Sequence, residues 1–383
     1  MPHTAYVIGA GPAGLAAAAA LQAKGVDVTV LEKSEHVGNA WRHHYDRLHL
    51  HTTRGLSGLP GLPIPREFGR WVARDDVVRY LEAYTKHHDL RIEHGVEVTR
   101  LDREGPADGE GRAHRTWTVT TTAGPRTADA VVVATGYNHT PHVPDWPGAD
   151  GFTGQIVHAS HYRNPAPHAG QDVLVVGVGN TGAEIAQDLA EGGAASVRLA
   201  VRTPPHIVRR NQGPWAAQYT GLLVRHLPTA LVDALSVPVR RASFPDVSHL
   251  GLPIPAVGLA SRVAQGAIPV QDIGLVAAVE SGAIQVVAPI ERFDGGEVVL
   301  ADGARLAPDV VLAATGYRRA LEPVLGHLGV LGERGKPIAT NGRPAAPGLY
   351  FTGFTNPISG MFLEMAADAR RIARNAARYF DSA

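Results

Sequence analysis

The sequence has no cysteine in 383 residues. Disulfide bonds and cysteine metal sites are therefore excluded, and so is the redox-active dithiol of a thioredoxin- or glutathione-reductase type enzyme. The formal net charge is +0 at pH 7, so nothing electrostatic favours nucleic acid or an anionic membrane as a partner. The histidines are scattered and lack metal-ligand spacing, so we expect no metal site.

Long apolar runs are missing as well. The alanine-rich stretch near the N-terminus is too short, and too close to a glycine, to be a signal peptide or a membrane span. We therefore expect no integral membrane segment and a cytoplasmic location. The length is sufficient for two domains with sizeable cores.

The most informative pattern is Gly-x-Gly-x-x-Gly, which occurs twice between an apolar strand and a helix. A glycine-rich turn before a helix N-terminus offers backbone N–H donors and a positive field to a pyrophosphate. After the first copy, the strand 26–31 ends in Glu32, an acid near the spacing expected for a ribose hydroxyl partner. The predicted cofactor-binding residues of this copy are Gly9, Gly11, Pro12, Ala13, Gly14, Glu32 and Lys33.

The second copy has the same order of elements, but its strand 197–201 ends in Arg202 and Thr203 with no acid. A carboxylate there would repel a 2′-phosphate, whereas a guanidinium can bind it through two hydrogen bonds. This favours FAD at the first copy and NADPH at the second; the alternative is that Arg202 is only a surface arginine. Asn180 should cap the second helix or touch phosphate. The predicted residues are Gly177, Gly179, Asn180, Thr181, Gly182, Arg202 and Thr203.

A second repeat is Ala-Thr-Gly-Tyr after a buried strand. In such a turn of small residues the backbone can lie close to a cofactor or cross between domains, and we expect cofactor contacts at Thr135, Gly136, Thr315 and Gly316. We predict an α/β fold with two Rossmann-like dinucleotide-binding domains. The NADPH domain (166–311) is inserted into the FAD domain (1–165 plus 312–383). Residues 102–129 alternate polar and apolar, which predicts a small antiparallel excursion.

Two helical segments are expected outside these repeats. Residues 214–243 carry leucines and valines at helical spacing, which favours packing in the core; docking on a membrane or partner is the alternative. Residues 350–354 predict a strand and turn that bring Gly353 and Phe354 to the cofactor. A helix from about 357 to 378 follows, and its positive N-terminus would suit the flavin pyrimidine edge.

The segment 152–162 reads Phe-Thr-Gly-Gln-Ile-Val-His-Ala-Ser-His-Tyr. It resembles the Phe-x-Gly-x-x-x-His-x-x-x-Tyr fingerprint of class B flavin-dependent monooxygenases (the flavin-containing monooxygenase family), and it likewise lies just ahead of the second glycine-rich loop. The Ala-Thr-Gly-Tyr turns are similar to that family's. Narrower similarity to the plant YUCCA-type branch lies in residues 41, 45–51, 59–63, 202–209, 251–253, 272–274 and 353–355.

The resemblance implies an FAD-dependent, NADPH-consuming monooxygenase that inserts one oxygen atom from O₂ into a small organic substrate through a C4a-(hydro)peroxyflavin. The substrate stays open among 2-oxo acids, amines, sulfides and ketones, and so does homodimer formation. The alternative is an NAD(P)H-dependent flavoprotein reductase that passes electrons to a ferredoxin-like protein or a quinone. That enzyme needs both cofactor sites but not the 152–162 fingerprint.

Animal-type members carry Asn followed by Lys on the loop beneath the flavin, whereas residues 51–54 here read His-Thr-Thr-Arg. The YUCCA-type pattern also has a histidine first. His51 is therefore the candidate catalytic residue, through a hydrogen bond to the nicotinamide or the flavin edge. Arg54 is expected to hold a phosphate or an acidic substrate; the alternative is that both residues only brace the loop. The resemblance adds Trp41 to the cofactor-binding residues.

Overall fold

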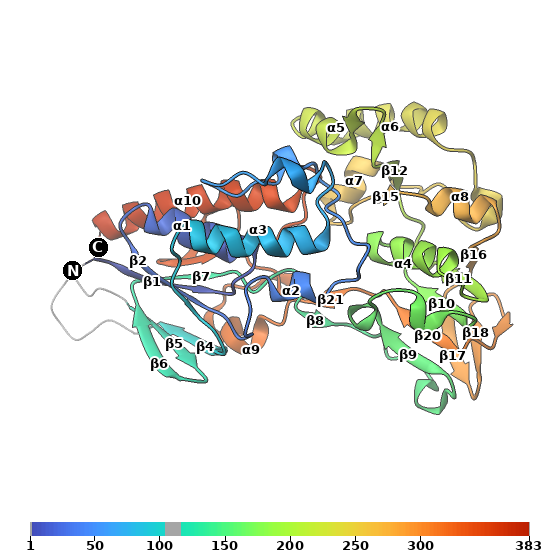
Figure 1. The fold of residues 1–383 in the computed structure, drawn as a ribbon, viewed down its shortest axis with the longest axis horizontal. Coiled ribbons are helices and arrows are strands. Elements are labelled where there is room, and N and C mark those ends of the chain that lie inside the picture. Colours follow the sequence, from blue (N-terminus) through green and yellow to red (C-terminus); the bar gives the residue numbers. More distant parts are fainter. Residues whose placement is uncertain (1, 104–115, 383) are drawn as a thin grey trace.

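The first α/β unit contains a mostly parallel sheet in the order β22-β23-β7-β1-β2-β3. The computed structural model describes residues 2–103 and 116–382, and Figure 1 shows its two units side by side. The strands of this sheet are β1 (Thr4–Ile8), β2 (Asp27–Leu31), β3 (Ile92–Glu93), β7 (Ala130–Val133), β22 (Pro344–Ala346) and β23 (Leu349–Phe351). Only β22 pairs antiparallel among them.

Three helices accompany this sheet: α1 (Pro12–Gln22), α3 (Arg74–His87) and α10 (Met361–Ser382). Helix α1 is apolar on every side because it packs on the sheet and lies between α10 and α3. Helix α10 instead buries one stripe, which includes Phe362, Met365, Ala369 and Ile372. The predicted C-terminal helix is thus confirmed.

The second unit repeats this plan with a parallel sheet in the order β16-β11-β10-β20-β9. Its strands are β9 (Gln155–His158), β10 (Asp172–Val176), β11 (Ser196–Ala200), β16 (Gln285–Val287) and β20 (Val310–Ala313). Its helices include α4 (Asn180–Glu191) and α8 (Leu275–Glu280). All these strands lie in the sequence between β7 and β22, so the second unit is inserted into the first. The domain limits at 165/166 and 311/312 stay a prediction, although β9 and β20 both belong to the second sheet.

Antiparallel strands extend both units. The predicted excursion at 102–129 corresponds in its described part to β4 (Val98–Arg103), β5 (Trp117–Thr121) and β6 (Gly124–Ala128); residues 104–115 lie outside the described chain. The second unit has β17 (Ile290–Asp294), β18 (Glu297–Leu300) and β19 (Arg305–Leu306). Short elements complete the fold: α2 (Asn39–Arg42), α9 (Glu322–Leu325), β8 (Thr140–Pro141), β21 (Tyr317–Arg318), β12 (Ile207–Arg209), β13 (Asn211–Gln212), β14 (Trp215–Ala216) and β15 (Val270–Asp272).

Three helices form a cap beside the second unit: α5 (Ala217–Val224), α6 (Thr229–Ser243) and α7 (Leu259–Ala264). The helical prediction for 214–243 is confirmed, but the expectation of core packing is wrong for α6. No residue of α6 is buried, and Leu231, Leu235 and Val239 are 46%, 53% and 57% exposed. Their side chains instead border a large cavity beneath the cap or face solvent.

Candidate cofactor and substrate site

Both glycine-rich turns have the same geometry. Gly9 donates its N–H to Leu31 O at 2.8 Å, and Gly177 donates to Ala200 O at 3.1 Å. Their φ angles are +104° and +100°, a region that only glycine enters without strain. Each turn is therefore fastened to the neighbouring strand just before its helix begins.

Each turn is tightly packed at its third glycine and leaves space at its second. A Cβ on Gly14 would lie 1.9 Å from Gly9 O, and one on Gly182 would lie 1.9 Å from Gly177 O. A Cβ on Gly11 or Gly179 would meet no atom within 4 Å. The open positions stand at the N-termini of α1 and α4, where a pyrophosphate fits and is attracted.

Glu32 and Arg202 follow corresponding strands but differ in their surroundings. Glu32 is 8% exposed; it accepts the Ala10 N–H at 2.7 Å and the Ser34 N–H and hydroxyl at 2.9 and 2.7 Å. Arg202 is exposed and has no hydrogen bond or ion pair with the described residues. Glu32 thus already braces the first turn, whereas Arg202 is available to an anion.

Two buried hydroxyls at the first unit's strand ends lack partners. Thr135 follows β7 and Thr352 follows β23, and neither Oγ1 has a hydrogen bond within the described chain. Beside Thr352, a Cβ on Gly353 would lie 2.9 Å from Ala13 Cβ in the first turn of α1. Buried hydroxyls are normally satisfied, so this edge fits a polar ligand. Phe354 is buried there, 5.9 Å from Phe351 between ring centroids.

In the second Ala-Thr-Gly turn, Thr315 and Gly316 already have hydrogen-bond partners within the protein. Thr315 Oγ1 donates to His142 O, and Gly316 O accepts the His142 N–H at 3.0 Å and lies 3.0 Å from His158 Nε2. These atoms hold the connection between the units. A cofactor contact for Thr315, and for Gly316, stays a prediction.

Asn180 does not cap its helix. Gly179 occupies the N-cap of α4 without a side-chain cap. Asn180 Nδ2 donates to Pro269 O at 3.3 Å and its Oδ1 accepts the Gln271 N–H at 2.7 Å. The capping interpretation is wrong because β15 competes for the amide.

Lys33 and Thr203 are exposed, and Lys33 Nζ lies 3.2 Å from His139 Nε2.

His51 lies where the two units meet. Its Nε2 is 2.5 Å from Glu184 Oε1 on α4, and the other oxygen of Glu184 accepts the Tyr45 hydroxyl at 2.9 Å. Glu184 is only 3% exposed. Burial and the neighbouring carboxylate hold the pKa of Tyr45 well above its usual value of 10. Tyr45 therefore stays a neutral hydroxyl donor to Glu184.

Sequence reasoning missed Tyr45 and Glu184. Their signal was a glutamate among the apolar positions that α4 turns toward the protein interior, since Ala183, Ile185 and Ala186 beside it are all buried. A buried carboxylate needs partners, and it finds them on the loop of the other unit. That pairing of distant segments is not legible in the sequence.

Trp41 and Arg54 border the same junction. Trp41 packs edge-on against Phe362 of α10, with ring centroids 5.8 Å apart. Arg54 Nη1 donates to Ile64 O at 3.1 Å, while its buried Nε has no partner in the described chain. Arg54 thus braces its loop and keeps one donor for a ligand.

The cavity beneath the cap has a volume of about 1450 Å³. Its wall combines leucines, valines, isoleucines and Phe244 with basic groups, and Glu364 is its one acidic residue in the described chain. Arg240 Nη1 and Gln271 Oε1 are buried on this wall and have no hydrogen bond to any described residue. The basic residues are His206, Arg209, Arg225, His226, Arg240, Arg241, Arg343 and Arg371. The cavity suits an apolar molecule with negative charge.

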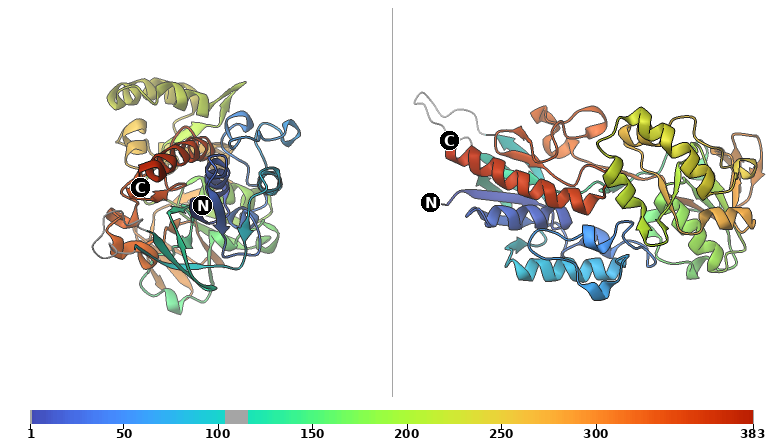
Figure 2. Two further views of the ribbon diagram at one scale, coloured as in Figure 1. Left: turned by 90° about the vertical axis from the view of Figure 1, so that its left-hand side faces the viewer. Right: turned by 90° about the horizontal axis from the view of Figure 1, so that it is seen from above.

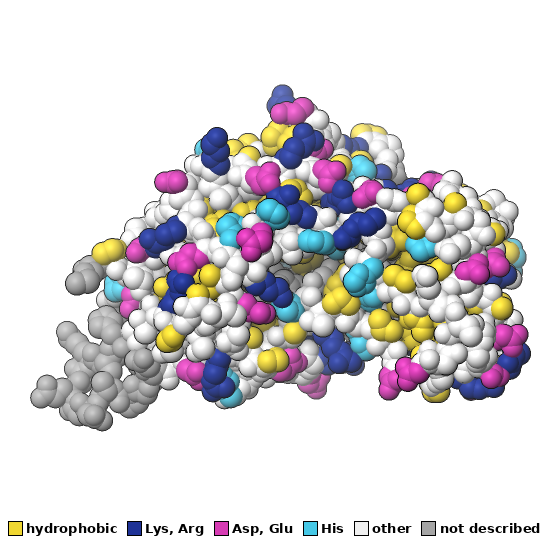
Figure 3. Space-filling model, turned by 60° about the horizontal axis from the view of Figure 1, so that its bottom comes forward, with side chains coloured by type: hydrophobic (Ala, Val, Ile, Leu, Met, Phe, Trp, Pro, Cys, Tyr) yellow, Lys and Arg dark blue, Asp and Glu magenta, His cyan; other side chains and the backbone are white. Residues whose placement is uncertain are grey.

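Figure 3 shows histidine and basic side chains around a recess near the middle of one face.

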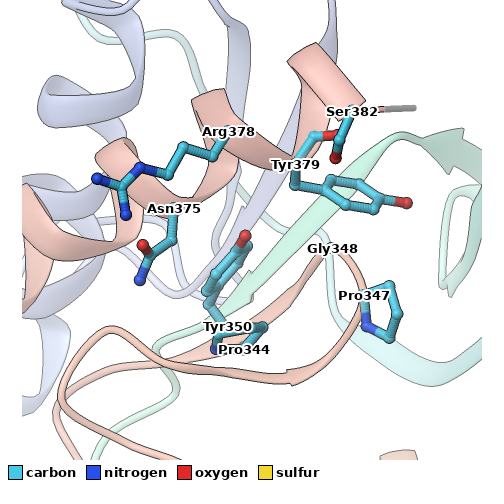
Figure 4. Close-up of a pocket in the computed structure, with 8 residues that line it drawn as sticks. All are labelled: Pro344, Pro347, Gly348, Tyr350, Asn375, Arg378, Tyr379 and Ser382. Atoms are coloured by element: carbon cyan, nitrogen blue, oxygen red, sulfur yellow. The ribbon is translucent and has the colours of Figure 1, made fainter.

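A smaller pocket of about 290 Å³ lies between the β22–β23 hairpin and the last turns of α10 (Figure 4), lined by Tyr350, Arg378 and Tyr379 among others. It opens at the amino end of β23. The glycine-rich turns lie at the opposite, carboxyl edge, where open α/β sheets bind their ligands.

Comparisons with known proteins agree with this geometry. Residues 6–216 match the pyridine nucleotide-disulphide oxidoreductase family. The chain is 35% identical over 378 residues to indole-3-pyruvate monooxygenase YUCCA1 of Oryza sativa subsp. japonica, with coverage of 97% of this chain and 90% of that relative. The chain belongs to the YUCCA-type flavin-dependent monooxygenases.

Solved structures agree with this assignment to class B flavin monooxygenases. A mutant flavin monooxygenase from Stenotrophomonas maltophilia superposes with a TM-score of 0.73 at 25% identity, covering 99% of this chain and 100% of that chain. OTEMO in complex with FAD and NADP has the same fold, with a TM-score of 0.71 at 19% identity over 99% of this chain and 86% of that chain.

As a YUCCA-type monooxygenase, the protein is an oxidoreductase that uses FAD, NADPH and O₂ on a small-molecule substrate. The predicted fold class and activity are confirmed, and the reductase alternative is not favoured. Within residues 2–103 and 116–382, no helix combines the length and apolarity that a membrane crossing requires.

Proposed function

We propose that this monooxygenase acts on an aromatic 2-oxo acid of the indole-3-pyruvate type, bound in the cap cavity. The observation that carries the proposal is the cavity wall, which is apolar and, but for Glu364, basic among its charged groups. An aromatic ring is stabilised by such a wall, and arginines bind a carboxylate. The rice relative, an indole-3-pyruvate monooxygenase, is named for the same substrate.

The reaction would balance as 2-oxo acid + NADPH + O₂ + H⁺ → shortened carboxylic acid + CO₂ + NADP⁺ + H₂O. Reduction of O₂ is chemistry that FAD supplies when bound. The chain's own residues hold the cofactors: Gly11 and the N-terminus of α1 would receive the FAD pyrophosphate, and the hydroxyls of Thr135 and Thr352 would bond its polar groups. Gly179 would receive the NADPH pyrophosphate and Arg202 the 2′-phosphate.

His51 would act by orientation. With the proton of its imidazole on Nε2, it donates to Glu184, which leaves Nδ1 as an acceptor for the nicotinamide amide or the flavin edge. Tyr45 donates to the second oxygen of the same carboxylate, so the histidine is held in one orientation. Arg54, through its free Nε, would bind an anionic group beside this loop.

The experiment is a product screen. Purified protein with FAD, NADPH and ¹⁸O₂ is offered indole-3-pyruvate, a sulfide, a tertiary amine and cyclohexanone, and products are identified by mass spectrometry. We expect one ¹⁸O atom in the acid formed from indole-3-pyruvate, together with CO₂. Oxygenation of only the sulfide, amine or ketone would reject the 2-oxo acid.

Homodimer formation and a cytoplasmic location stay predictions from the sequence. Sedimentation velocity at micromolar concentration tests the first, and fractionation of the producing cells tests the second. The predicted domain limits are tested by producing the fragments 166–311 and 155–313 separately; if the predicted limits are right, the shorter fragment folds and binds NADPH on its own.

A further inference from the structure

Three segments far apart in the sequence meet at one buried glutamine. Gln218, in the first turn of α5, is 2% exposed. Its Oε1 accepts the N–H and the hydroxyl of Thr53 at 2.9 and 3.1 Å. Its Nε2 donates to Ser359 O at 2.6 Å. Both ends of the side-chain amide are therefore engaged, each by a different segment of the first unit.

The three segments pack closely at this junction. A Cβ on Gly360 would lie 2.4 Å from Thr52 Cγ2 and 3.0 Å from Gln218 Nε2. A Cβ on Gly221, one turn further along α5, would lie 3.0 Å from Ile358 Cγ1. The cap therefore touches the loop of His51 and the turn before α10 at the same place.

Gln218 also belongs to the wall of the cap cavity, together with Ile358 and Ser359. One face of the junction thus borders the space proposed for the substrate. The other holds Thr53, two residues from His51, and Ser359, two residues before α10 begins at Met361.

Burying an amide is unfavourable unless both of its polar ends are hydrogen-bonded. Because hydrogen bonds are directional whereas apolar contacts are not, the bonds of a buried amide fix the orientation of the groups that they join. The glutamine therefore specifies where the cap stands relative to the two loops.

We propose that Gln218 is a positioning residue that fastens the His51 loop and the N-terminal turn of α10 to the cap, and thereby keeps O₂ reduction coupled to oxygen transfer. When the fastening is lost, water enters the site and electrons leave as peroxide, in the balanced reaction NADPH + H⁺ + O₂ → NADP⁺ + H₂O₂. The inference uses the monooxygenase activity of the family. It does not depend on which substrate the enzyme accepts.

The test compares Gln218→Ala, Gln218→Glu and the control Gln265→Ala. Gln265 follows α7 in the same cap but lies outside the lining of the cavity; it is exposed, and its Oε1 accepts from Arg262 Nη1 at 3.3 Å. Hydrogen–deuterium exchange is followed in peptides covering 52–57 and 357–361, with and without FAD. Peroxide release is measured with NADPH and O₂ but no substrate, and anaerobic flavin reduction by NADPH is timed separately.

We expect Gln218→Ala to speed exchange about tenfold in both segments and to raise peroxide release roughly fivefold, while anaerobic reduction changes less than about twofold. Gln218→Glu should loosen only 357–361, because a carboxylate still accepts from Thr53 but cannot donate to Ser359. The control should match the wild type.

Two results would overturn the proposal: exchange in both segments equal to that of Gln265→Ala, or looser segments with unchanged peroxide release. If Gln218→Ala does not fold, the isosteric Gln218→Glu decides by the same two criteria. Because no substrate is present, a negative product screen with indole-3-pyruvate leaves this outcome unaffected.

Discussion

The two dinucleotide units share a backbone but differ in one charge. Both turns bend at a glycine with positive φ, close on their helix at the third glycine and stay open at the second. At the end of the next strand, the first unit has a buried glutamate that is hydrogen-bonded to its own turn, and the second has an exposed arginine with no partner among the described residues.

This difference separates two tasks. Glycines set the shape of the cradle, and so act alike in both units. The residue after the second strand selects the adenosine, because a carboxylate bonds ribose hydroxyls and repels a 2′-phosphate that a guanidinium attracts. Substitutions in matched positions should therefore affect one cofactor at a time.

The largest effect is expected from the third glycine of each turn. In Gly14→Ala the new methyl would lie 1.9 Å from Gly9 O, so the turn must open. We expect the Kd for FAD to rise roughly 100-fold, equivalent to about 3 kcal/mol of overpacking. Gly182→Ala, with the same clash against Gly177 O, should keep its bound FAD, whereas its Kd for NADPH should rise to a similar extent.

Flavin absorbance after gel filtration and titration with NADPH measure the two affinities. Gly151→Ala is the control, since a Cβ there meets no atom within 4 Å. Loss of FAD from Gly182→Ala as well, in a folded protein, would contradict the independence of the two cradles.

The next effect concerns the charge itself. Arg202→Ala should raise the KM for NADPH about 30-fold, because it removes a charge-assisted contact to the 2′-phosphate of roughly 2 kcal/mol. The KM for NADH should stay within about twofold, and bound FAD should not change. Steady-state NAD(P)H oxidation gives both constants. Equal increases for the two nucleotides would show that Arg202 does not recognise the phosphate.

Much of this comparison could be predicted from the sequence because it is local. Strand, glycine turn, helix and the residue after the next strand follow one another within about thirty residues, so Gly9 to Glu32 and Gly177 to Arg202 were identified from spacing alone. The antiparallel excursion and the C-terminal helix also follow from short-range periodicity.

Contacts between distant segments could not be predicted. Asn180 bonds β15, some ninety residues onward, instead of capping its helix. Helix α6 has apolar residues at helical spacing, yet it covers a cavity instead of a core. Periodicity shows which face of a helix is apolar but not what lies opposite it. For the same reason, the partners of Glu184 and Gln218 emerge only from the fold.

A third prediction compares the contacts where the units meet. Glu184→Gln keeps the volume but weakens the hold on His51, because a neutral amide replaces a carboxylate 2.5 Å from Nε2. We expect anaerobic flavin reduction by NADPH to slow about tenfold, with the FAD content unchanged. Tyr45→Phe removes only the second hydrogen bond of that carboxylate and should slow reduction about threefold. Stopped-flow absorbance measures both, and an unaltered rate in Glu184→Gln would reject orientation through His51.

The last comparison concerns two buried carboxylates, one in each unit. Both oxygens of Glu184 have partners, whereas Asp368 on α10, 2% exposed, has Arg371, at 3.3 Å, as its one ion-pair partner among the described residues. Burial raises the pKa of Asp368 to about 6, above its value of 3.8 in the unfolded chain, so the folded state binds the extra proton between these values. The contribution of Asp368 to stability is therefore fully present below pH 3.8 and is lost as pH rises through 6. Asp368→Asn, which carries no charge to desolvate, should be more stable than the wild type by roughly 1–3 kcal/mol at pH 7.5, and the gain should shrink toward zero at pH 4. Urea unfolding at the two pH values measures it, and a gain of equal size at both would show that ionisation of Asp368 is not its cause.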